Sequence, residues 1–576
     1  MPIPESQRNA LRRHLAVIYG GRAEDALEQL EAVIQRNRPT IEGKNRRPWS
    51  ERDIVLITYA DQIRGPVLTP LHDLHKFLRR HDLFGTISTI HLLPFFPYSS
   101  DDGFSVIDYR QVDPQVGIWR DVERLGGDVQ LMFDLVLNHV SPKSHWFGEY
   151  RQGSEPYTNW FIEVDPGADL SAVTRPRSTP LLTQVETSRG SRHVWTTFGD
   201  DQIDLNFANP QVLAEVVDIL LFYVEKGARI IRLDAIAYLW KRIGTSCIHL
   251  PESHEVVKLM RSVLDSVAPG TLLLTETNVP HEENVSYFGH GDEAHMVYQF
   301  SLPPLLLDAL LTGDAHYLVR WLANLQQPEP GMTFFNFTAS HDGVGVRPLE
   351  GLVPPERVDA LADAARARGG HVSTRRRPDG TEAPYELNIS YFDALGEPSG
   401  LNPQRHARRF LASQLVMLAL RGIPGVYFHS LVATPNDHAG VEQTSRARSI
   451  NRHKFSPDEL EAAIVHPGSA QQIVFDAYRR ALSVRICQPA FHPEAEQIVF
   501  VPDDPALVAF CRTSLDGGQK IQVLANTSDK PLEVDLAALG MVGSSRDLLA
   551  EAESPLIGER LTLGPWQVAW LECGEC

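Results

Sequence analysis

Eight short apolar segments, most of them separated by longer stretches with helical periodicity, constrain the fold of this chain more than any other feature. None alternates apolar and polar residues, which is typical of strands buried on both faces. Alternating strands and helices with eight parallel strands predict an α/β fold, a closed (β/α)8 TIM barrel. An open doubly wound sheet is the alternative, although no glycine-rich phosphate turn follows the first segment. The segments are Ile54–Tyr59, Thr89–Leu93, Leu131–Val136, Ala228–Leu233, Leu272–Glu276, Met296–Phe300, Thr333–Ser340 and Gly425–Phe428.

Four further segments lie outside the barrel pattern, which takes residues 51–139 and 201–490. Residues 1–50 carry apolar side chains at helical spacing and predict an N-terminal helical extension. Residues 140–200 and 343–401 are too long for ordinary connections, so we expect an inserted subdomain after the third strand and a lid-like insertion after the seventh. Residues 491–576 contain short apolar runs between turns and predict a C-terminal antiparallel β domain.

The charge balance excludes some classes of partner. Lys and Arg total 54 and Asp and Glu total 73, so the net charge is −19. We therefore expect no binding to nucleic acid or to an anionic membrane surface. Five cysteines, the lack of a long apolar run, and an N-terminus without a signal-like apolar stretch predict a cytoplasmic protein. Whether it forms a homodimer stays open.

Polar residues directly follow several of the buried segments. Asn138 and His139 follow the third, Asp234 closes the fourth, Glu276 ends the fifth, and Asp342 follows the seventh. In barrel enzymes the carboxyl ends of the strands build the active site. Burying polar groups is costly unless they are paired or used, so their recurrence at one end of the barrel predicts a functional site there.

The chemistry of this site follows from two carboxylic acids. Asp234 and Glu276 end consecutive strands, which lie about 4.8 Å apart, so their carboxyl groups can approach to about 5–5.5 Å, the separation of a nucleophile and an acid/base in retaining glycoside transfer. Arg232, on the same face as Asp234, should keep that carboxyl ionised, and crowding should hold a proton on Glu276. Asp342 would face the developing oxocarbenium ion. A purely structural Arg–Asp pair with a strand-end Glu is the alternative.

These residues also carry a resemblance to a known family. Asp134 to His139, Arg232 to Asp234, Glu276 and His341-Asp342 resemble the four signature regions of the α-amylase family. Further motifs are similar to the sucrose phosphorylase branch, and some of them, with the N-terminal extension, to its glucosylglycerate phosphorylases. The motifs for the branch include His91–Pro97, Asp101–Phe104, Arg175–Arg177 and Ser449–His453, and those for the subgroup are Ser99–Tyr109, Asp169–Arg177 and Glu276–Pro280.

The resemblance implies a role for each matching residue. Asp234 matches the nucleophile, Glu276 the acid/base, and Asp342 the transition-state stabiliser. Arg177 in the first insertion and Tyr385 in the second match loop positions that meet phosphate or the acceptor. Their neighbours Arg175 and Glu386 are further candidates for substrate binding. The positions around the glucose are matched by Asp101, Phe104, His139, Arg232, His341 and Arg448.

The implied activity is that of a retaining glucosyl phosphorylase, with no cofactor and no metal. It would cleave 2-O-α-glucosylglycerate with inorganic phosphate, reversibly, to α-glucose 1-phosphate and glycerate through a β-glucosyl-enzyme. Thr277-Asn278 after Glu276, and Glu386 after Tyr385, depart from the sucrose phosphorylase pattern. The alternatives are a sucrose or glucosylglycerol phosphorylase, a hydrolase or transglucosylase of the same family, and a non-catalytic carbohydrate-binding relative.

Overall fold

The computed structural model describes residues 4–41, 47–177, 179–376, 381–400, 402–540, 545–550 and 559–573. Eight parallel strands close into a barrel in the order β1-β15-β11-β10-β9-β8-β3-β2. Because β1 pairs with both β2 and β15, the sheet has no open edge. The predicted fold class is confirmed, and the open-sheet alternative is wrong. The barrel strands are β1 Val55–Thr58, β2 Thr89–Leu92, β3 Gln130–Val136, β8 Ala228–Asp234, β9 Leu272–Thr275, β10 Met296–Tyr298, β11 Thr333–Phe337 and β15 Ile423–Tyr427.

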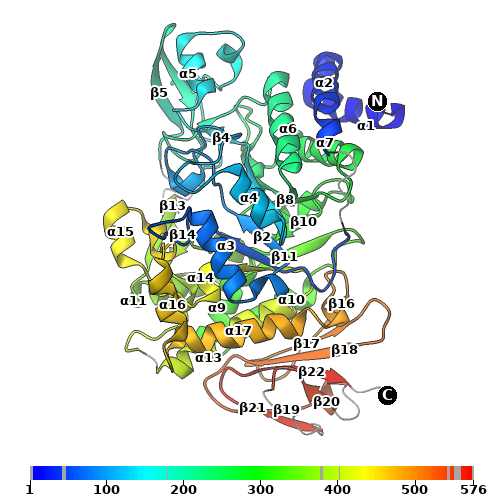
Figure 1. The fold of residues 1–576 in the computed structure, drawn as a ribbon, viewed down its shortest axis with the longest axis vertical. Coiled ribbons are helices and arrows are strands. Elements are labelled where there is room, and N and C mark those ends of the chain that lie inside the picture. Colours follow the sequence, from blue (N-terminus) through cyan, green and yellow to red (C-terminus); the bar gives the residue numbers. More distant parts are fainter. Residues whose placement is uncertain are drawn as a thin grey trace.

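Helices surround the barrel and cover its outer face (Figure 1). Several begin with a proline in their first turn, where the missing N–H costs no hydrogen bond and the ring presets a helical φ; α3, α6 and α7 are examples. Their apolar faces pack on strands that are buried on both sides. The covering helices are α3 Pro70–Arg80, α4 Trp119–Gly126, α6 Pro210–Glu225, α7 Pro251–Val267, α9 Leu302–Thr312, α10 His316–Asn324, α13 Pro403–Ala419 and α17 Ala470–Arg485.

The N-terminal extension forms two helices, α1 Glu5–Tyr19 and α2 Ala23–Ile41. They lie against α7 and α6 (Figure 1). Their buried leucines and isoleucines join the main hydrophobic core. Polar contacts fix the packing: His14 Nδ1 lies 2.8 Å from Glu255 Oε2, and the Tyr19 hydroxyl donates to the Phe207 carbonyl at 2.9 Å. The extension is therefore packed onto the barrel helices.

Two insertions rise above the carboxyl ends of the strands. The first contains α5 His145–Gln152, the hairpin of β5 Leu182–Thr187 and β6 Gly190–Trp195, and the short pair β4 His139–Val140 and β7 Ile203–Asp204. The second contains α11 Pro355–Ala367 and a sheet in the order β12-β14-β13. This sheet brings residues of the second insertion to the mouth of the barrel. Its strands are β12 Val344–Gly345, β13 His371–Arg376 and β14 Glu382–Asn388.

The C-terminal part is antiparallel and lies at the end of the molecule opposite the first insertion (Figure 1). Five strands form one sheet, in the order β16-β17-β18-β22-β20, and two form another. The predicted antiparallel β domain is confirmed, and β20 Ser545–Asp547 is one of its strands that is too short to stand out in the sequence. The others are β16 Glu496–Phe500, β17 Leu507–Thr513, β18 Lys520–Asn526, β19 Leu532–Asp535, β21 Arg560–Leu563 and β22 Val568–Cys573.

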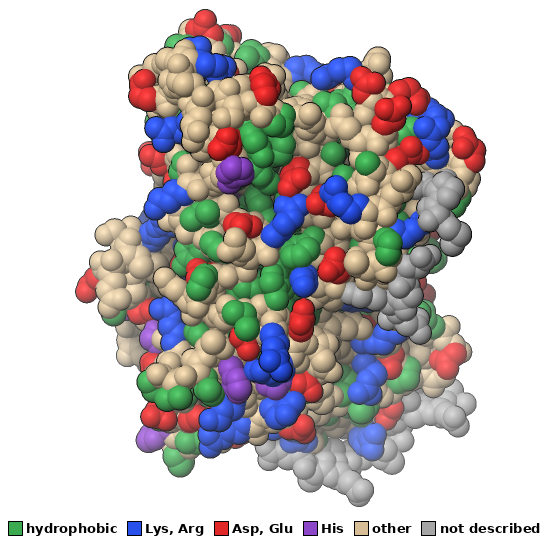
Figure 2. Space-filling view, turned by 45° about the horizontal axis from the view of Figure 1, so that its top comes forward, with side chains coloured by type: hydrophobic (Ala, Val, Ile, Leu, Met, Phe, Trp, Pro, Cys, Tyr) green, Lys and Arg blue, Asp and Glu red, His purple; other side chains and the backbone are tan. Residues whose placement is uncertain are grey.

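The surface agrees with an ordinary globular protein. Acidic and basic side chains are interspersed over the face seen in Figure 2, so the net charge of −19 forms no single-sign patch there. Of the helices that the structure describes, none is long and apolar enough to cross a membrane. The predicted domain boundaries at residues 50, 140, 200, 343, 401 and 490 stay predictions.

Candidate active site

The floor of the site is organised around one buried arginine. Arg232, on β8, is 2% exposed, and its Nη1 contacts Asp134 of β3 and lies 2.7 Å from Asp234 Oδ1. Its Nη2 lies 3.9 Å from Glu276 Oε2. Both predicted catalytic carboxyls thus lie near the same guanidinium, but Asp234 is much closer to it than Glu276 is. This places one full positive charge beside Asp234 and a weaker field at Glu276.

A further layer fixes the arginine itself. His91 Nε2, on β2, lies 2.6 Å from Asp134 Oδ2, and both side chains are completely buried. Burial alone would raise the pKa of Asp134, but Arg232 and His91 outweigh it and lower the pKa. Asp134 therefore stays a carboxylate that holds Arg232 in place. It is a positioning residue beneath the site.

The two carboxyls of Asp234 and Glu276 titrate as a pair. Burial raises the pKa of Glu276 to about 7, with Asp234 and Asp342 adding to the effect and Arg232 opposing it. Burial also raises the pKa of Asp234, again against Arg232, so the expectation that Arg232 would dominate there needs correction. Because Arg232 lies much closer to Asp234, one shared proton belongs on Glu276 at neutral pH. The Ala235 N–H, which donates to Glu276 Oε2 at 3.0 Å, orients that carboxyl.

Asp342 follows β11, and two arginines keep its carboxyl ionised. Arg448 Nη1 is 2.5 Å from its Oδ1, and His341 Nε2 is 3.5 Å from its Oδ2. Burial would raise the pKa of Asp342, but the guanidinium groups of Arg448 and Arg452 lower it well below its ordinary range. Burial lowers the pKa of His341 to about 3, so that ring is neutral. A permanent negative charge faces the cavity at Asp342.

A strained loop supplies the wall at Asp101 and Phe104. Asp101 and Asp102 both have left-handed φ values, 52° and 49°, which are uncommon for non-glycine residues. A Cβ at Gly103 would lie 2.4 Å from the Pro94 carbonyl oxygen, so the turn requires glycine. The loop sets the Phe104 ring flat on His341, with centroids 4.5 Å apart at an interplanar angle of 5°.

His139 and its neighbours form the next part of the wall. Its Nε2 lies 2.9 Å from the Phe104 carbonyl oxygen and 3.1 Å from Gln202 Nε2. The side chain of Asn138 turns the other way, toward a buried ion pair: Lys241 Nζ is 2.6 Å from Asn138 Oδ1 and also contacts Asp204. The ammonium of Lys241 thus occupies the oxygen-lined position beside Asn138 where a cation would bind.

Two cavities that share lining residues lead into the site. The inner one, of about 80 Å³, lies between the predicted catalytic carboxyls and Phe104, His139 and His341. The outer one, of about 520 Å³, extends toward solvent between the two insertions. Both are lined by Asp101, Arg177, Tyr385 and Arg448. The structure therefore brings most of the predicted glucose residues and most of the predicted loop residues to one continuous space, while Arg232 lies buried beneath it.

Two of the predicted loop residues behave differently from the expectation. Arg175 is not among the described residues that line either cavity, because Pro176 turns the chain and the Arg175 guanidinium donates to the Thr179 carbonyl of its own loop. Glu386 lines the outer cavity but is 2% exposed. Its two carboxylate oxygens accept from Arg448 at 3.0 and 2.7 Å, so it holds that arginine.

Comparison with known proteins identifies the family. Residues 84–325 match the model for the α-amylase catalytic domain, and residues 498–570 match that for the maltogenic amylase C-terminal domain. The chain is 46% identical to a glucosylglycerate phosphorylase of Allomeiothermus silvanus, with 98% of each chain covered. The chain belongs to the glucosylglycerate phosphorylase family. The resemblance inferred from the signature residues is thereby confirmed.

Other members and relatives agree with this assignment. A glucosylglycerate phosphorylase of Escherichia coli is 43% identical, over 97% of this chain and 99% of its own. Among solved structures, the sucrose 6F-phosphate phosphorylase of Thermoanaerobacter thermosaccharolyticum superposes with a TM-score of 0.72 at 25% identity, covering 84% of this chain and 95% of its own. Most of the fold is thus shared beyond the glucosylglycerate phosphorylase family.

Sequence reasoning missed several residues of the site. Arg446 and Gln202 line the outer cavity. Arg452, which lies within a quoted motif but received no role, is 5% exposed, contacts Asp102 and donates to the His341 carbonyl at 2.7 Å. Lys241 gave no signal, because only the fold brings it to Asp204. The two arginines at positions 446 and 448, separated by one residue, are the signal in the sequence that could have indicated a second basic segment at the site.

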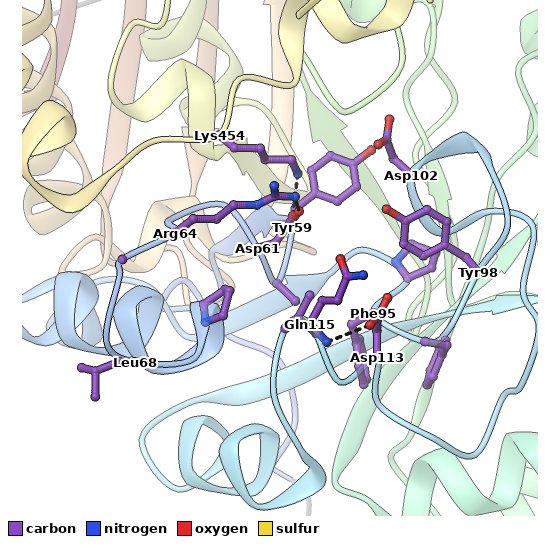
Figure 3. A pocket seen from close by; sticks show the side chains of 16 residues that line it. Tyr59, Asp61, Arg64, Leu68, Phe95, Tyr98, Asp102, Asp113, Gln115 and Lys454 are labelled. Carbon is purple, nitrogen blue, oxygen red and sulfur yellow. Dashed lines mark hydrogen bonds and ion pairs between the residues drawn. The ribbon is translucent and has the colours of Figure 1, made fainter. Parts of the chain in front are cut away.

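A separate cavity of about 310 Å³ lies behind the glucose site. Tyr59 separates the two, since its ring meets His341 edge-on at 6.2 Å. Figure 3 shows Lys454, Arg64 and Asp61 on one side of Tyr59 and Asp102 on the other. Lys454 and Arg64 both pair with Asp61. Of the cations that the structure describes in this cavity, none is left without a carboxylate, so its charge does not match phosphate.

Proposed function

We propose that the protein is a retaining glucosyl phosphorylase that converts 2-O-α-glucosylglycerate and phosphate into α-glucose 1-phosphate and glycerate, reversibly. One observation carries the proposal. Asp234 and Glu276 share Arg232 at the bottom of a cavity whose mouth holds Arg177. The floor supports a double displacement, and the arginine at the mouth supports an anionic acceptor. The names of the family members point to the same reaction.

In the first step, a carboxylate oxygen of Asp234 attacks the anomeric carbon of the glucoside. The bond from that carbon to the glycerate oxygen breaks, and Glu276 transfers its proton to the departing oxygen. A pKa of about 7 leaves about half of Glu276 protonated at neutral pH and most of it protonated below, as a general acid requires. The product of this step is a β-glucosyl ester of Asp234. Glycerate leaves with a hydroxyl group at the oxygen that was bonded to glucose.

In the second step, phosphate takes the place of glycerate. A phosphate oxygen attacks the anomeric carbon, the ester bond to Asp234 breaks, and Glu276 takes back a proton if phosphate arrives as the monoanion. Two inversions give the α anomer of glucose 1-phosphate. Asp342, which Arg448 and Arg452 keep ionised, faces the positive charge that develops on the sugar in both steps.

The glucose itself is held by the buried wall. Asp101 offers a charged partner for its hydroxyls, Arg448 lines the same space while it holds Asp342, and Phe104, stacked on His341, offers a flat surface. Arg177 lies 3.4 Å from Asp101 and over the Phe198 ring at 5.7 Å, with a side chain that is 36% exposed. Tyr385, whose pKa is raised by burial, adds a neutral hydroxyl. These loop residues meet phosphate or glycerate, in line with the family positions that they match.

A hydrolase using the same residues is the second candidate, because water can also attack the glucosyl ester. Arg177 at the mouth favours phosphate, which gains from a cationic partner where water does not. We place the enzyme in the cytoplasm on the ground of its few cysteines. Light scattering distinguishes a homodimer from a monomer.

The test is an incubation of the purified protein with phosphate and a panel of α-glucosides, in which glucose 1-phosphate is detected enzymatically. We expect glucose 1-phosphate from 2-O-α-glucosylglycerate, at a rate above those from sucrose and 2-O-α-glucosylglycerol. Free glucose in place of glucose 1-phosphate would make the protein a hydrolase. A higher rate with sucrose would move it to the sucrose phosphorylases.

A further inference from the structure

We infer that Arg446 forms, with Arg177, a two-arginine clamp that binds the carboxylate of the acceptor, and that this clamp makes the enzyme select hydroxy acids over neutral polyols. The inference rests on the proposed function and names a residue that determines its acceptor specificity. The argument begins with the charges that line the outer cavity.

Among the residues that the structure describes, four arginines line the outer cavity, and two of them are held by short contacts to the floor. Arg448 contacts Asp342 and both carboxylate oxygens of Glu386. Arg452, with a side chain 3% exposed, pairs with Asp102 and donates to the His341 carbonyl. These two arginines therefore maintain the floor, and a ligand could recruit them only by breaking short contacts in a buried network.

The other two arginines, Arg177 and Arg446, are only loosely held. Of the carboxylates that the structure describes, Asp101 alone is within 4.0 Å of either: 3.4 Å from Arg177 Nη2 and 4.0 Å from Arg446 Nη1. Their side chains are 36% and 45% exposed. The Asp101 carboxylate thus faces two long, partly exposed arginine side chains. Arg177 lies at the limit of hydrogen-bond distance from it, and Arg446 lies beyond that limit. A second carboxylate entering here would gain charge-assisted hydrogen bonds without displacing a strong internal pair.

The backbone delivers Arg446 to this place in a defined way. Helix α15 His438–Thr444 ends in Ser445, whose φ is 56°, and the chain then enters the short helix η8 Ala447–Asn451. The Thr444 hydroxyl accepts from the Arg446 N–H at 3.2 Å and lies 2.7 Å from Ser449 Oγ. The segment that carries Arg448 and Arg452 into the floor therefore also fixes the Cα of Arg446 at the mouth.

The rest of the outer cavity offers partners for hydroxyl groups. Ser373 and Thr374 on β13 and Asn388 on β14 line it. Asn388 Nδ2 donates to Ser373 Oγ at 2.9 Å, whereas its buried Oδ1 has no hydrogen-bond partner among the described residues. Arginines from the first insertion and η8, with hydroxyl and amide groups from the second insertion, match a small molecule that carries a carboxylate and hydroxyls. Glycerate has this composition, and glycerol has only the hydroxyls.

The test measures transfer from glucose 1-phosphate to three acceptors, namely glycerate, glycerol and water, in the wild type and in Arg446→Gln. A charge-assisted hydrogen bond is worth roughly 10- to 100-fold in affinity. We expect the KM for glycerate to rise by about that factor in Arg446→Gln, with little change for glycerol, for water or for phosphate in the reverse direction. Arg446→Lys, which keeps the charge, should give an intermediate KM.

The matched control is Arg366→Gln on α11, an exposed arginine paired with Asp363 outside the cavity, which should leave all rates unchanged. An unaltered glycerate KM in Arg446→Gln, an equal loss for glycerate and glycerol, or a loss of phosphate use as large as that of glycerate would each overturn the clamp. The wild-type arm separates the two proposals. Without transfer to glycerate by the wild type, the proposed function itself fails, and the clamp with it.

Discussion

The floor and the mouth of the active site are built in opposite ways. On the floor, Arg232, Asp134 and Asp234 are at most 7% exposed, sit on barrel strands and are joined by short contacts. At the mouth, Arg177 extends from a loop of the first insertion and Arg446 from the turn between α15 and η8, and they meet a carboxylate at 3.4 and 4.0 Å. Rigid strands fix charges for bond breaking, and loosely held loop side chains can exchange one anion for another.

The difference teaches where each property of such an enzyme resides. Electrostatic stabilisation of a transition state requires charges that are already in place, because reorganising them during the reaction costs free energy. Successive binding of glycerate and phosphate at one mouth requires the reverse, since a tightly paired arginine would bind neither. We therefore assign the making of the glucosyl-enzyme to the floor and the choice of its partner to the mouth.

The largest effect is expected from the nucleophile. Asp234→Asn should lower turnover by at least about 1000-fold while the fold stays intact, because the covalent step disappears. Initial rates and circular dichroism check this, with Asp363→Asn on the surface as the control. A variant that keeps more than a few per cent of the wild-type activity would remove Asp234 from this role and break the assignment of chemistry to the floor.

The next effect concerns pH and Glu276. Its pKa is about 7, and the reaction needs the protonated form, so kcat/KM for the glucoside should be level below pH 7 and fall about tenfold per pH unit above it. Rates from pH 5 to 9 measure this limb.

A fluoride leaving group sharpens the same prediction. Fluoride leaves without a proton, so α-glucosyl fluoride should show no alkaline limb in its first step, and Glu276→Gln should still be glucosylated by it. An alkaline limb of equal size with the fluoride would assign the titration to another group.

Much of the floor could be predicted from the sequence, and much of the mouth could not. Short, mostly apolar runs revealed all eight barrel strands, and polar residues near their ends marked Arg232, Asp234 and Glu276, which the structure brings together. Side chains on loops follow no such period. The turn at Pro176 decides that Arg177 reaches the cavity and Arg175 does not, and the pairing of Glu386 with Arg448 depends on a sheet formed only in the fold.

The smallest effect is the one expected from metal removal. The Lys241 ammonium already pairs with Asp204 beside Asn138, so activity should survive exhaustive EDTA treatment. A loss of activity that calcium restores would contradict this.

The Lys241–Asp204 pair should also matter for stability. Lys241→Met leaves the Asp204 carboxylate buried without a cationic partner, a change that costs about 3–5 kcal/mol in the free energy of unfolding. Thermal unfolding, with exposed Lys143→Met as the control, measures that loss.

The division between floor and mouth is tested most directly by how the glucosyl-enzyme is partitioned between phosphate and water. In Arg177→Ala, the ratio of glucose 1-phosphate to free glucose, followed by NMR, should fall roughly 10- to 100-fold, the value of a charge-assisted hydrogen bond. The rate of hydrolysis should fall much less, because the floor is untouched. Equal losses of phosphorolysis and hydrolysis would mean that Arg177 serves the glucose or the fold, and would contradict the account.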